Sequence, residues 1–278
     1  MKTVKPSQKA RNKRSGYLRV KEIMNEKHPT IYADELATKA RATIRDLSLR
    51  ILPAIGENKK ILGVVTRGDV LAISASVSPI RVKGIMTNPK HIPTADDDVT
   101  LTVKEMLRVD EWSVPVVGSA NDKIYRGVLG LENYIEAIVK TSPEKLAKPV
   151  SEIMSTSIVT CTPEDEIDQI WRLMQRKAFA GLPVIKGNKL VGIVTQKDLL
   201  DAGAALPVFE SAKGRFREQT KVSSIMKTQV IAVEPSIKVI RVAKIMVSKD
   251  IGRVPVKNEE GRLIGIVDRD DVVRSLVK

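Results

Sequence analysis

Residues 189–200 read Lys-Leu-Val-Gly-Ile-Val-Thr-Gln-Lys-Asp-Leu-Leu. The apolar half of this stretch predicts a buried strand, and the threonine followed three residues later by aspartate predicts the start of a helix. The same phrase returns at 61–71, at 263–273 with aspartate in place of threonine, and at 126–134 without either residue. Four copies of one strand-to-helix phrase form an internal repeat, which decides the architecture before any local prediction.

A second phrase, Val-x-x-Ile-Met, precedes each copy of the first. Its methionines recur at intervals of roughly 60 to 70 residues. Hydrophobic periodicity after each methionine indicates a strand, a helix, two strands joined by a turn, and a second helix. The phrase stands at 20–24, 82–86, 150–154 and 222–226, and the repeats that it opens span 20–78, 79–141, 150–205 and 222–278.

The repeats are expected to occur in pairs. A small sheet with helices on one side leaves its other apolar face uncovered. Two repeats that stack sheet on sheet bury that face. We therefore predict an α/β fold with two tandem modules, at residues 20–145 and 146–278, behind a basic N-terminal arm at residues 1–19.

The two phrases and their spacing resemble the CBS domain, the repeat of cystathionine beta-synthase, over nearly the whole chain from residue 20 to residue 278. The resemblance implies that repeats pair into tandem modules. Four repeats in one chain are similar to the gamma subunit of AMP-activated protein kinase, which implies a flat disc with pseudo-fourfold symmetry.

The composition of the chain limits the classes of function that it can have. The chain has 278 residues with a formal net charge of +14, which favours an anionic partner such as a nucleotide, a nucleic acid or an acidic protein. One cysteine excludes an intramolecular disulfide, and with only two histidines a structural zinc site is not expected. No apolar run approaches the roughly 20 residues that span a bilayer, and the N-terminus lacks the apolar segment of a signal peptide. We expect a cytoplasmic protein without membrane contact.

The sequence carries no catalytic phrase. It contains no Gly-x-Ser-x-Gly, no phosphate-binding loop that ends in Gly-Lys-Ser or Gly-Lys-Thr, and no Cys/His pairing around Cys161. Acidic residues are scattered, and no spacing forces two of them together. These observations predict a protein that is not an enzyme, with no catalytic residue, no metal and no cofactor.

Two Thr-x-x-Asp phrases, Thr66…Asp69 and Thr195…Asp198, provide the best candidate binding residues. A threonine at a helix N-cap directs its hydroxyl and the free backbone N–H groups to one point, and such a terminus attracts phosphate. A carboxylate three residues later can accept both hydrogens of a ribose diol. The same spacing also forms a capping box, so a purely structural role stays open.

The resemblance carries a role to these pairs, because Thr/Ser-x-x-Asp in the CBS family binds the ribose and phosphates of adenosine ligands. Cations beside the aspartates favour a phosphorylated ligand; they are Arg67, Lys197 and Arg269. The resemblance also implies an adenine contact at Thr160, and Gly181 lets a ring approach the backbone. The candidates of repeat three are Ile153, Ile158, Thr160, Gly181 and Pro183, for which sheet packing is the alternative.

Repeats four and two depart from the phrase. In repeat four, Asp271 can serve a ribose, while Asp268 would repel phosphate. Arg269 and Arg253 can offset that repulsion, and the resemblance implies a phosphate contact at Arg253. In repeat two, Asn133 stands at the aspartate position, and an amide is a weaker diol acceptor than a carboxylate. We expect the repeat-two site to be weak or empty.

The function predicted from the sequence is a regulatory adenosine-ligand sensor. AMP, ADP or ATP would bind between paired repeats, and the change would be read by a partner protein. One alternative keeps the fold and changes the ligand to S-adenosylmethionine or methylthioadenosine. The other is a nucleic-acid-binding protein, supported by the net charge and the basic arm, but with only 3% aromatic residues for base stacking. Association of two chains into a homodimer stays open.

Overall fold

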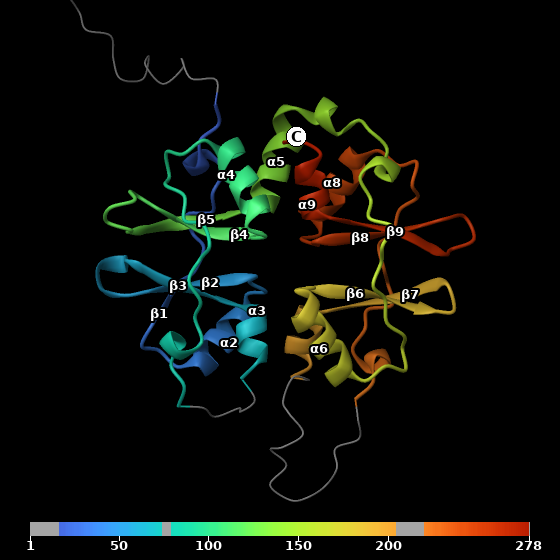
Figure 1. Cartoon of the computed structure of the whole chain (residues 1–278), viewed down its shortest axis with the longest axis horizontal. Helices are drawn as coiled ribbons and strands as arrows, with labels where there is room; N and C mark the ends of the chain where they lie inside the picture. The colour runs from blue at the N-terminus through green and yellow to red at the C-terminus, as the bar shows by residue number, and fades with distance from the viewer. Residues whose placement is uncertain (1–16, 74–78, 204–219, 278) are drawn as a thin grey trace, which may run out of the picture.

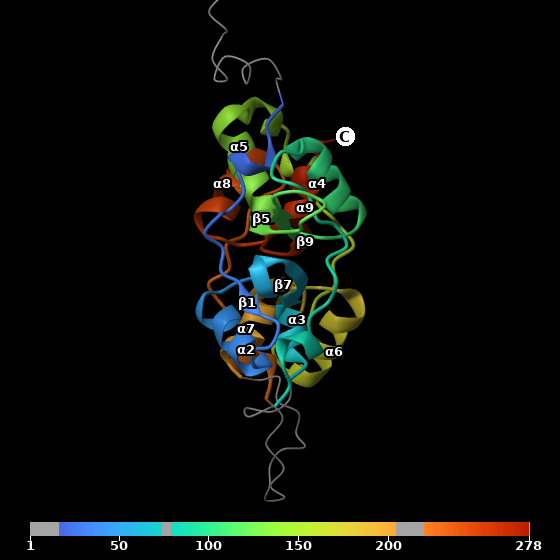
Figure 2. The ribbon, with the colours of Figure 1, turned by 90° about the vertical axis from the view of Figure 1, so that its left-hand side faces the viewer.

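The computed structural model describes residues 17–73, 79–203 and 220–277. Four units, each with a strand hairpin and helices, make up the molecule, as Figure 1 shows. Repeats one and two (blue to green) form one half, and repeats three and four (yellow to red) form the other. Turned by 90°, the molecule presents a narrow edge, so it is a flat disc (Figure 2). Of the basic arm predicted at residues 1–19, residues 1–16 lie outside the described residues.

Each repeat places an antiparallel hairpin between two helices. Repeat one consists of β1 (Ile31–Tyr32), α2 (Ala37–Asp46), β2 (Ile51–Ile55), β3 (Ile61–Thr66) and α3 (Arg67–Leu71); repeat two of α4 (Val99–Arg108), β4 (Ser113–Val117), β5 (Tyr125–Gly130) and α5 (Leu131–Thr141). Repeat three consists of α6 (Ile167–Lys177), β6 (Gly181–Lys186), β7 (Lys189–Thr195) and α7 (Gln196–Asp201); repeat four of α8 (Val239–Ser248), β8 (Arg253–Lys257), β9 (Leu263–Asp268) and α9 (Arg269–Arg274).

The first strand of each repeat is shorter than the sequence predicts. Repeat one keeps a two-residue strand, β1, parallel to β2. In repeats two, three and four it shrinks to one bridge, such as Cys161 to Val184, and in repeat three residues 157–159 form no strand. The second phrase itself forms single turns of 3-10 helix, at Val20–Glu22, Val82–Gly84, Val150–Glu152 and Val222–Ser224.

The residue after each methionine crosses to the partner repeat of its pair. Asn25 bridges to Val128 in β5 and Thr87 to Val64 in β3; Ser155 bridges to Ile266 in β9 and Lys227 to Ile193 in β7. We call these four residues the crossing residues. Repeats one and two therefore exchange their leading segments, and so do repeats three and four.

This exchange explains why glycine and methionine recur together. A Cβ added at Gly192 would lie 2.9 Å from the Met226 sulfur, and one added at Gly265 would lie 2.5 Å from the Met154 sulfur. At Gly127 the added Cβ would meet the backbone oxygen of Asn25 at 2.7 Å. The glycine of the first phrase thus makes room for the second phrase of the partner repeat, which is the physical link between the two.

The two largest apolar clusters run across the halves of the disc. One cluster joins repeats two and four, with Ile135 of α5, Val242 of α8 and Val272 of α9 all fully buried. The other joins repeats one and three, with Ile44 of α2 and Leu199 of α7 fully buried. The helices of repeats two and four consequently lie together beyond the sheets on one side, and those of one and three on the other (Figure 1).

The helices are short. Among the described residues, none is long and apolar enough to cross a membrane.

Candidate functional site

The two Thr-x-x-Asp phrases lie where a strand turns into a helix. Thr66 ends β3 and caps α3, and Thr195 ends β7 and caps α7. The Oδ2 atom of Asp69 accepts hydrogen bonds from the Thr66 backbone N–H and hydroxyl, both at 2.7 Å. The Oδ2 atom of Asp198 accepts the same pair from Thr195, at 2.8 and 2.5 Å. One carboxylate oxygen of each aspartate therefore closes a capping box, and the other is left for a further partner.

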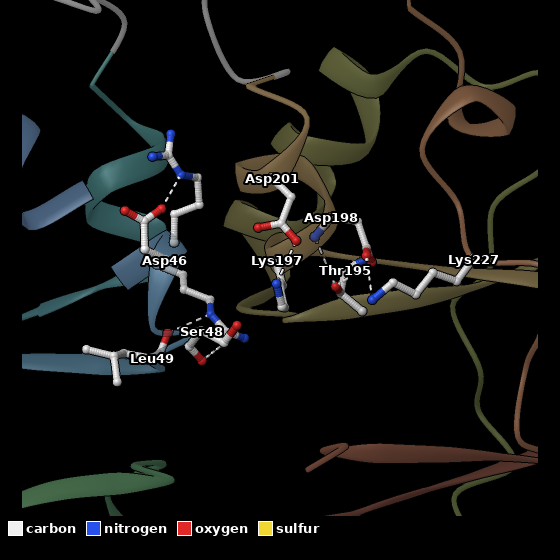
Figure 3. Close-up of polar contacts among 10 residues, drawn as sticks. Asp46, Ser48, Leu49, Thr195, Lys197, Asp198, Asp201 and Lys227 are labelled. Atoms are coloured by element: carbon white, nitrogen blue, oxygen red, sulfur yellow. Dashed lines mark hydrogen bonds and ion pairs between the residues drawn. The ribbon is translucent and has the colours of Figure 1, made fainter. Parts of the chain in front are cut away.

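The second carboxylate oxygen distinguishes the two sites. Asp69 Oδ1 has no partner among the described residues, and the side chain is half-buried. Asp198 Oδ1 lies 3.2 Å from the Nζ atom of Lys227, in an ion pair between a carboxylate 4% exposed and a lysine 61% exposed. Figure 3 shows Lys227 reaching toward Asp198 from outside the helix. In repeat one, Asp69 Oδ1 is therefore free, within the described part of the chain, to accept from a ribose diol. In repeat three, the ammonium of Lys227 occupies the equivalent oxygen of Asp198.

The cations beside these aspartates already have partners. Arg67 donates hydrogen bonds to the backbone oxygens of Leu49 and Ser48. Burial, and then the charge of Arg50, lowers the pKa of Arg67 to about 10, which still leaves it charged at neutral pH. Lys197 pairs with Asp201 one turn along α7, at 2.6 Å (Figure 3). A phosphate contact at either cation requires an exchange of partners.

The repeat-four site holds two carboxyl groups, Asp268 and Asp271, whose pKa values are raised. Asp271 Oδ2 accepts a hydrogen bond from the Asp268 backbone N–H at 2.7 Å, as in the other repeats. Burial, with repulsion from Asp270 and Asp268, raises the pKa of Asp271 to about 7. Burial also raises the pKa of Asp268, although the Arg253 Nε atom 3.4 Å away opposes the shift. This site therefore carries less negative charge than its sequence suggests.

The two arginines of the repeat-four site that were expected to contact phosphate are engaged inside the protein. Arg269 is fully buried, with Nη1 at 3.0 Å from Glu132 Oε2 and Nη2 at 2.9 Å from Asp250 Oδ1. Arg253 donates to the backbone oxygen of Gly181 and lies over the Trp112 ring, 5.9 Å from its centroid. In this arrangement neither guanidinium is free, so a phosphate contact needs these bonds to open.

Repeat two contains a cavity of about 250 Å³ at the start of α5, where the sequence predicted a weak or empty site. The Asn133 carbonyl accepts a hydrogen bond from the Gly130 N–H at 2.8 Å, so the amide replaces the capping carboxylate. Burial lowers the pKa of His28, which is therefore neutral at neutral pH. The cavity is lined by residues of repeats one, two and four: Asn25, His28, Leu47, Ser48, Leu49, Arg50, Ile51, Ser113, Val128, Glu132, Asn133 and Asp250.

The candidates of repeat three lie in different parts of the fold. Ile153 packs against the core of repeats two and four, because its segment crosses to β9. The segment that carries Ile158 and Thr160 follows this crossing point. Gly181 lies opposite Thr195, and an added Cβ would meet the Thr195 methyl at 2.8 Å. Pro183 lies inside the hairpin, opposite Ile193.

Sequence reasoning missed the crossing residues and the residues before the first hairpin strand, such as Ser48. The signal for the first group was present, since each directly follows the methionine of the second phrase. For the second group no phrase marks the positions. Among the described residues, no group of three or more His, Cys, Asp or Glu side chains lies close enough to hold a metal.

Comparison with known proteins agrees with this architecture. The CBS domain family matches residues 20–76, 150–205 and 222–278. The protein MJ1225 of Methanocaldococcus jannaschii is 26% identical over 280 residues, which cover 93% of this chain and 99% of that protein. Its crystal structure, described as a candidate archaeal homologue of γ-AMPK, has a TM-score of 0.80 at 24% identity, covering 92% of this chain and 99% of that one.

A conserved protein of Pyrococcus horikoshii has a similar fold, with a TM-score of 0.65 and 22% identity over 93% of this chain and all of that one. The family matches three of the four repeats, and repeat two, which lacks both threonine and aspartate, is the one without a match. With two phrases in fixed order, paired repeats and these matches, the chain belongs to the CBS domain family.

Proposed function

We propose that this protein is a regulatory binding protein for adenosine ligands, without catalytic activity of its own. The ligands bind beside the second helices of the repeats, AMP, ADP or ATP being the favoured class. The observation that carries the proposal is the cavity of about 250 Å³ at the start of α5, between the paired repeats one and two. Four apolar side chains line it, and its other lining residues are polar or charged, so it offers partners to the polar groups of a ligand.

A second observation supports a ribose contact in repeat one. The Oδ1 atom of Asp69 has no protein partner among the described residues, while Oδ2 accepts from the N–H and hydroxyl of Thr66 at the start of α3. Hydrogen bonds to a charged acceptor contribute about 1.5 to 3 kcal/mol, which corresponds to roughly a 10- to 100-fold change in affinity.

Regulation follows from how the cavity is built. Its wall includes Arg50 from repeat one, Glu132 from repeat two and Asp250 from repeat four. A ligand that changes the contacts of these side chains favours one relative arrangement of the two halves, by as much as its affinities for the two arrangements differ. We propose that a partner protein reads this change. We also propose that the two halves are the modules 20–145 and 146–278, which meet between residues 145 and 146.

The test is isothermal titration of the nucleotide-free chain with AMP, ADP, ATP, S-adenosylmethionine, methylthioadenosine and a short DNA duplex. Asp69→Asn is the informative variant, because Asn133 shows that an amide at this position still caps its helix. We expect Asp69→Asn to lower the affinity of the repeat-one site at least tenfold. Asp98→Asn, at the N-cap of α4, is the matched control and should bind as the wild type does.

Three results are decisive. Binding of a phosphorylated nucleotide that Asp69→Asn weakens supports the proposal. Binding of S-adenosylmethionine or methylthioadenosine alone moves the protein to the sulfur-containing ligands. Binding of the duplex alone would make the Thr-x-x-Asp phrases helix caps only, and the protein a nucleic-acid-binding one.

A further inference from the structure

The four crossing residues occupy equivalent places but differ in charge. Each pairs with the second hairpin strand of the partner repeat, close to where that strand turns into a helix. Three of them, Asn25, Thr87 and Ser155, are uncharged, and the fourth is Lys227. A lysine at this one position gives the Asp198 site a cation that the corresponding residues of the other repeats lack.

The backbone of Lys227 is fixed while its ammonium is not. Its N–H donates to the Ile193 oxygen and its oxygen accepts from the Ile193 N–H, both at 2.9 Å. The side chain is 61% exposed and reaches Asp198 Oδ1 at 3.2 Å. The carboxylate of this pair is buried, but the lysine is exposed, so its ammonium can exchange Asp198 for another anionic partner. Because the stem is anchored, an ammonium that leaves Asp198 stays beside whatever binds there.

A ligand diol that takes Asp198 Oδ1 must displace this ammonium, since the other oxygen closes the capping box. For an uncharged ligand the ion pair is lost without replacement. For a ligand with an anionic group, the displaced ammonium gains a charge-assisted bond. We propose that Lys227 makes the Asp198 site selective for adenosine ligands that carry an anionic 5′ group. This inference rests on the proposed function.

The experiment compares AMP with methylthioadenosine, which share adenosine and differ in a 5′ phosphate against an uncharged methylthio group. Titration of the full chain and of Asp198→Asn defines the binding component that belongs to this site. In Lys227→Gln we expect the dissociation constant of that component to rise about tenfold for AMP. For methylthioadenosine it should stay unchanged or fall, because the competing ion pair is gone.

Lys221→Gln is the matched control. It removes one positive charge from the same leading segment, where Lys221 pairs with Glu164 at 2.7 Å, and it should change neither affinity more than twofold. If Lys227→Gln weakens or tightens both ligands by the same factor, or leaves both unchanged, the inference is wrong. It is also wrong if no binding depends on Asp198. Should no adenosine ligand bind the wild type at all, the proposed function fails as well; loss of binding in Asp69→Asn alone would preserve that function.

A second variant tests whether a lysine at this position is sufficient. Thr87 pairs with Val64 beside Thr66 and Asp69 as Lys227 pairs with Ile193 beside Thr195 and Asp198. Thr87→Lys should raise the preference for AMP over methylthioadenosine at the Asp69 site about tenfold. An unchanged ratio at that site, in a variant that folds as the wild type, would contradict a general role for the crossing residue in charge selection.

Discussion

Arg269 in α9 and Glu132 in α5 form an ion pair between repeats four and two, with 3.0 Å between Nη1 and Oε2. Asp250 binds the other terminal nitrogen of Arg269 at 2.9 Å and also pairs with Arg50 of repeat one at 3.0 Å. One chain of charges thus connects three repeats. Since Glu132, Asp250 and Arg50 also line the repeat-two cavity, the joint between repeats and the candidate site share a wall.

Arg269→Ala should lower the free energy of unfolding by about 3 kcal/mol, because it leaves a cavity and removes the cation paired with Glu132, while Asp250 keeps only its pair with Arg50. Arg108→Ala is the control, since Arg108 forms an exposed pair with Glu105 and should contribute less than about 1 kcal/mol. Urea denaturation measures both. Arg269→Met restores volume without charge, so a loss as large as that of Arg269→Ala assigns the effect to the ion pairs. Equal small losses in Arg269→Ala and Arg108→Ala would contradict a role for this network in stability.

Asp271→Asn should stabilise the protein above neutral pH. The folded-state pKa of Asp271, about 7, lies above its unfolded value of 3.8, so the folded state binds the proton more tightly. Stability from this group is complete below pH 4 and is lost as the pH rises toward 7. The variant should therefore equal the wild type near pH 4 and exceed it by about 1 to 2 kcal/mol at pH 8, after allowance for solvent screening. Thermal unfolding across that range measures the difference, and parallel curves for the two proteins would refute the shift.

Gly127→Ala should destabilise the protein by about 1 to 3 kcal/mol and weaken any ligand of the repeat-two cavity, because the new Cβ meets the Asn25 backbone oxygen at 2.7 Å. Gly68→Ala is the matched control. Its Cβ would meet nothing closer than 3.5 Å, and alanine favours the helix, so this variant should be as stable as the wild type or slightly more so. Thermal denaturation and ligand titration test both variants. A neutral Gly127→Ala would show that the crossing segment can shift without cost.

Much of the architecture was predictable from the sequence because the repeat signal is local. Each phrase spans only a few residues, and its periodicity, glycine and capping pair report the strand and helix directly. The order of the two phrases along the chain does not show which repeat each second phrase packs against. Only the structure shows that Met226 packs on Gly192 and Met154 on Gly265, since those contacts form between repeats.

The candidate site was less predictable, because its charges are set by distant residues. Arg269 stands beside aspartates in the sequence, which suggested a phosphate contact. Its actual partners, Glu132 and Asp250, come from another repeat and from the loop before β8, and no local pattern brings them together. In the same way, Asn133 in place of aspartate predicted a weak or empty site, and no local pattern predicted the cavity there, because it depends on side chains from three repeats.

The cores and the crossing segments bind the repeats in different pairs, and together they close a ring. The two large cores join one with three and two with four; crossing segments join one with two and three with four. A fragment that ends at residue 145 would keep its crossings and lose both core partners, exposing the apolar faces of α2 and α5. Two such fragments can cover each other's faces. The single chain is thus the covalent equivalent of a dimer of two-repeat proteins, in which the linker allows the two halves to acquire different residues, such as Lys227 on one side and Thr87 on the other.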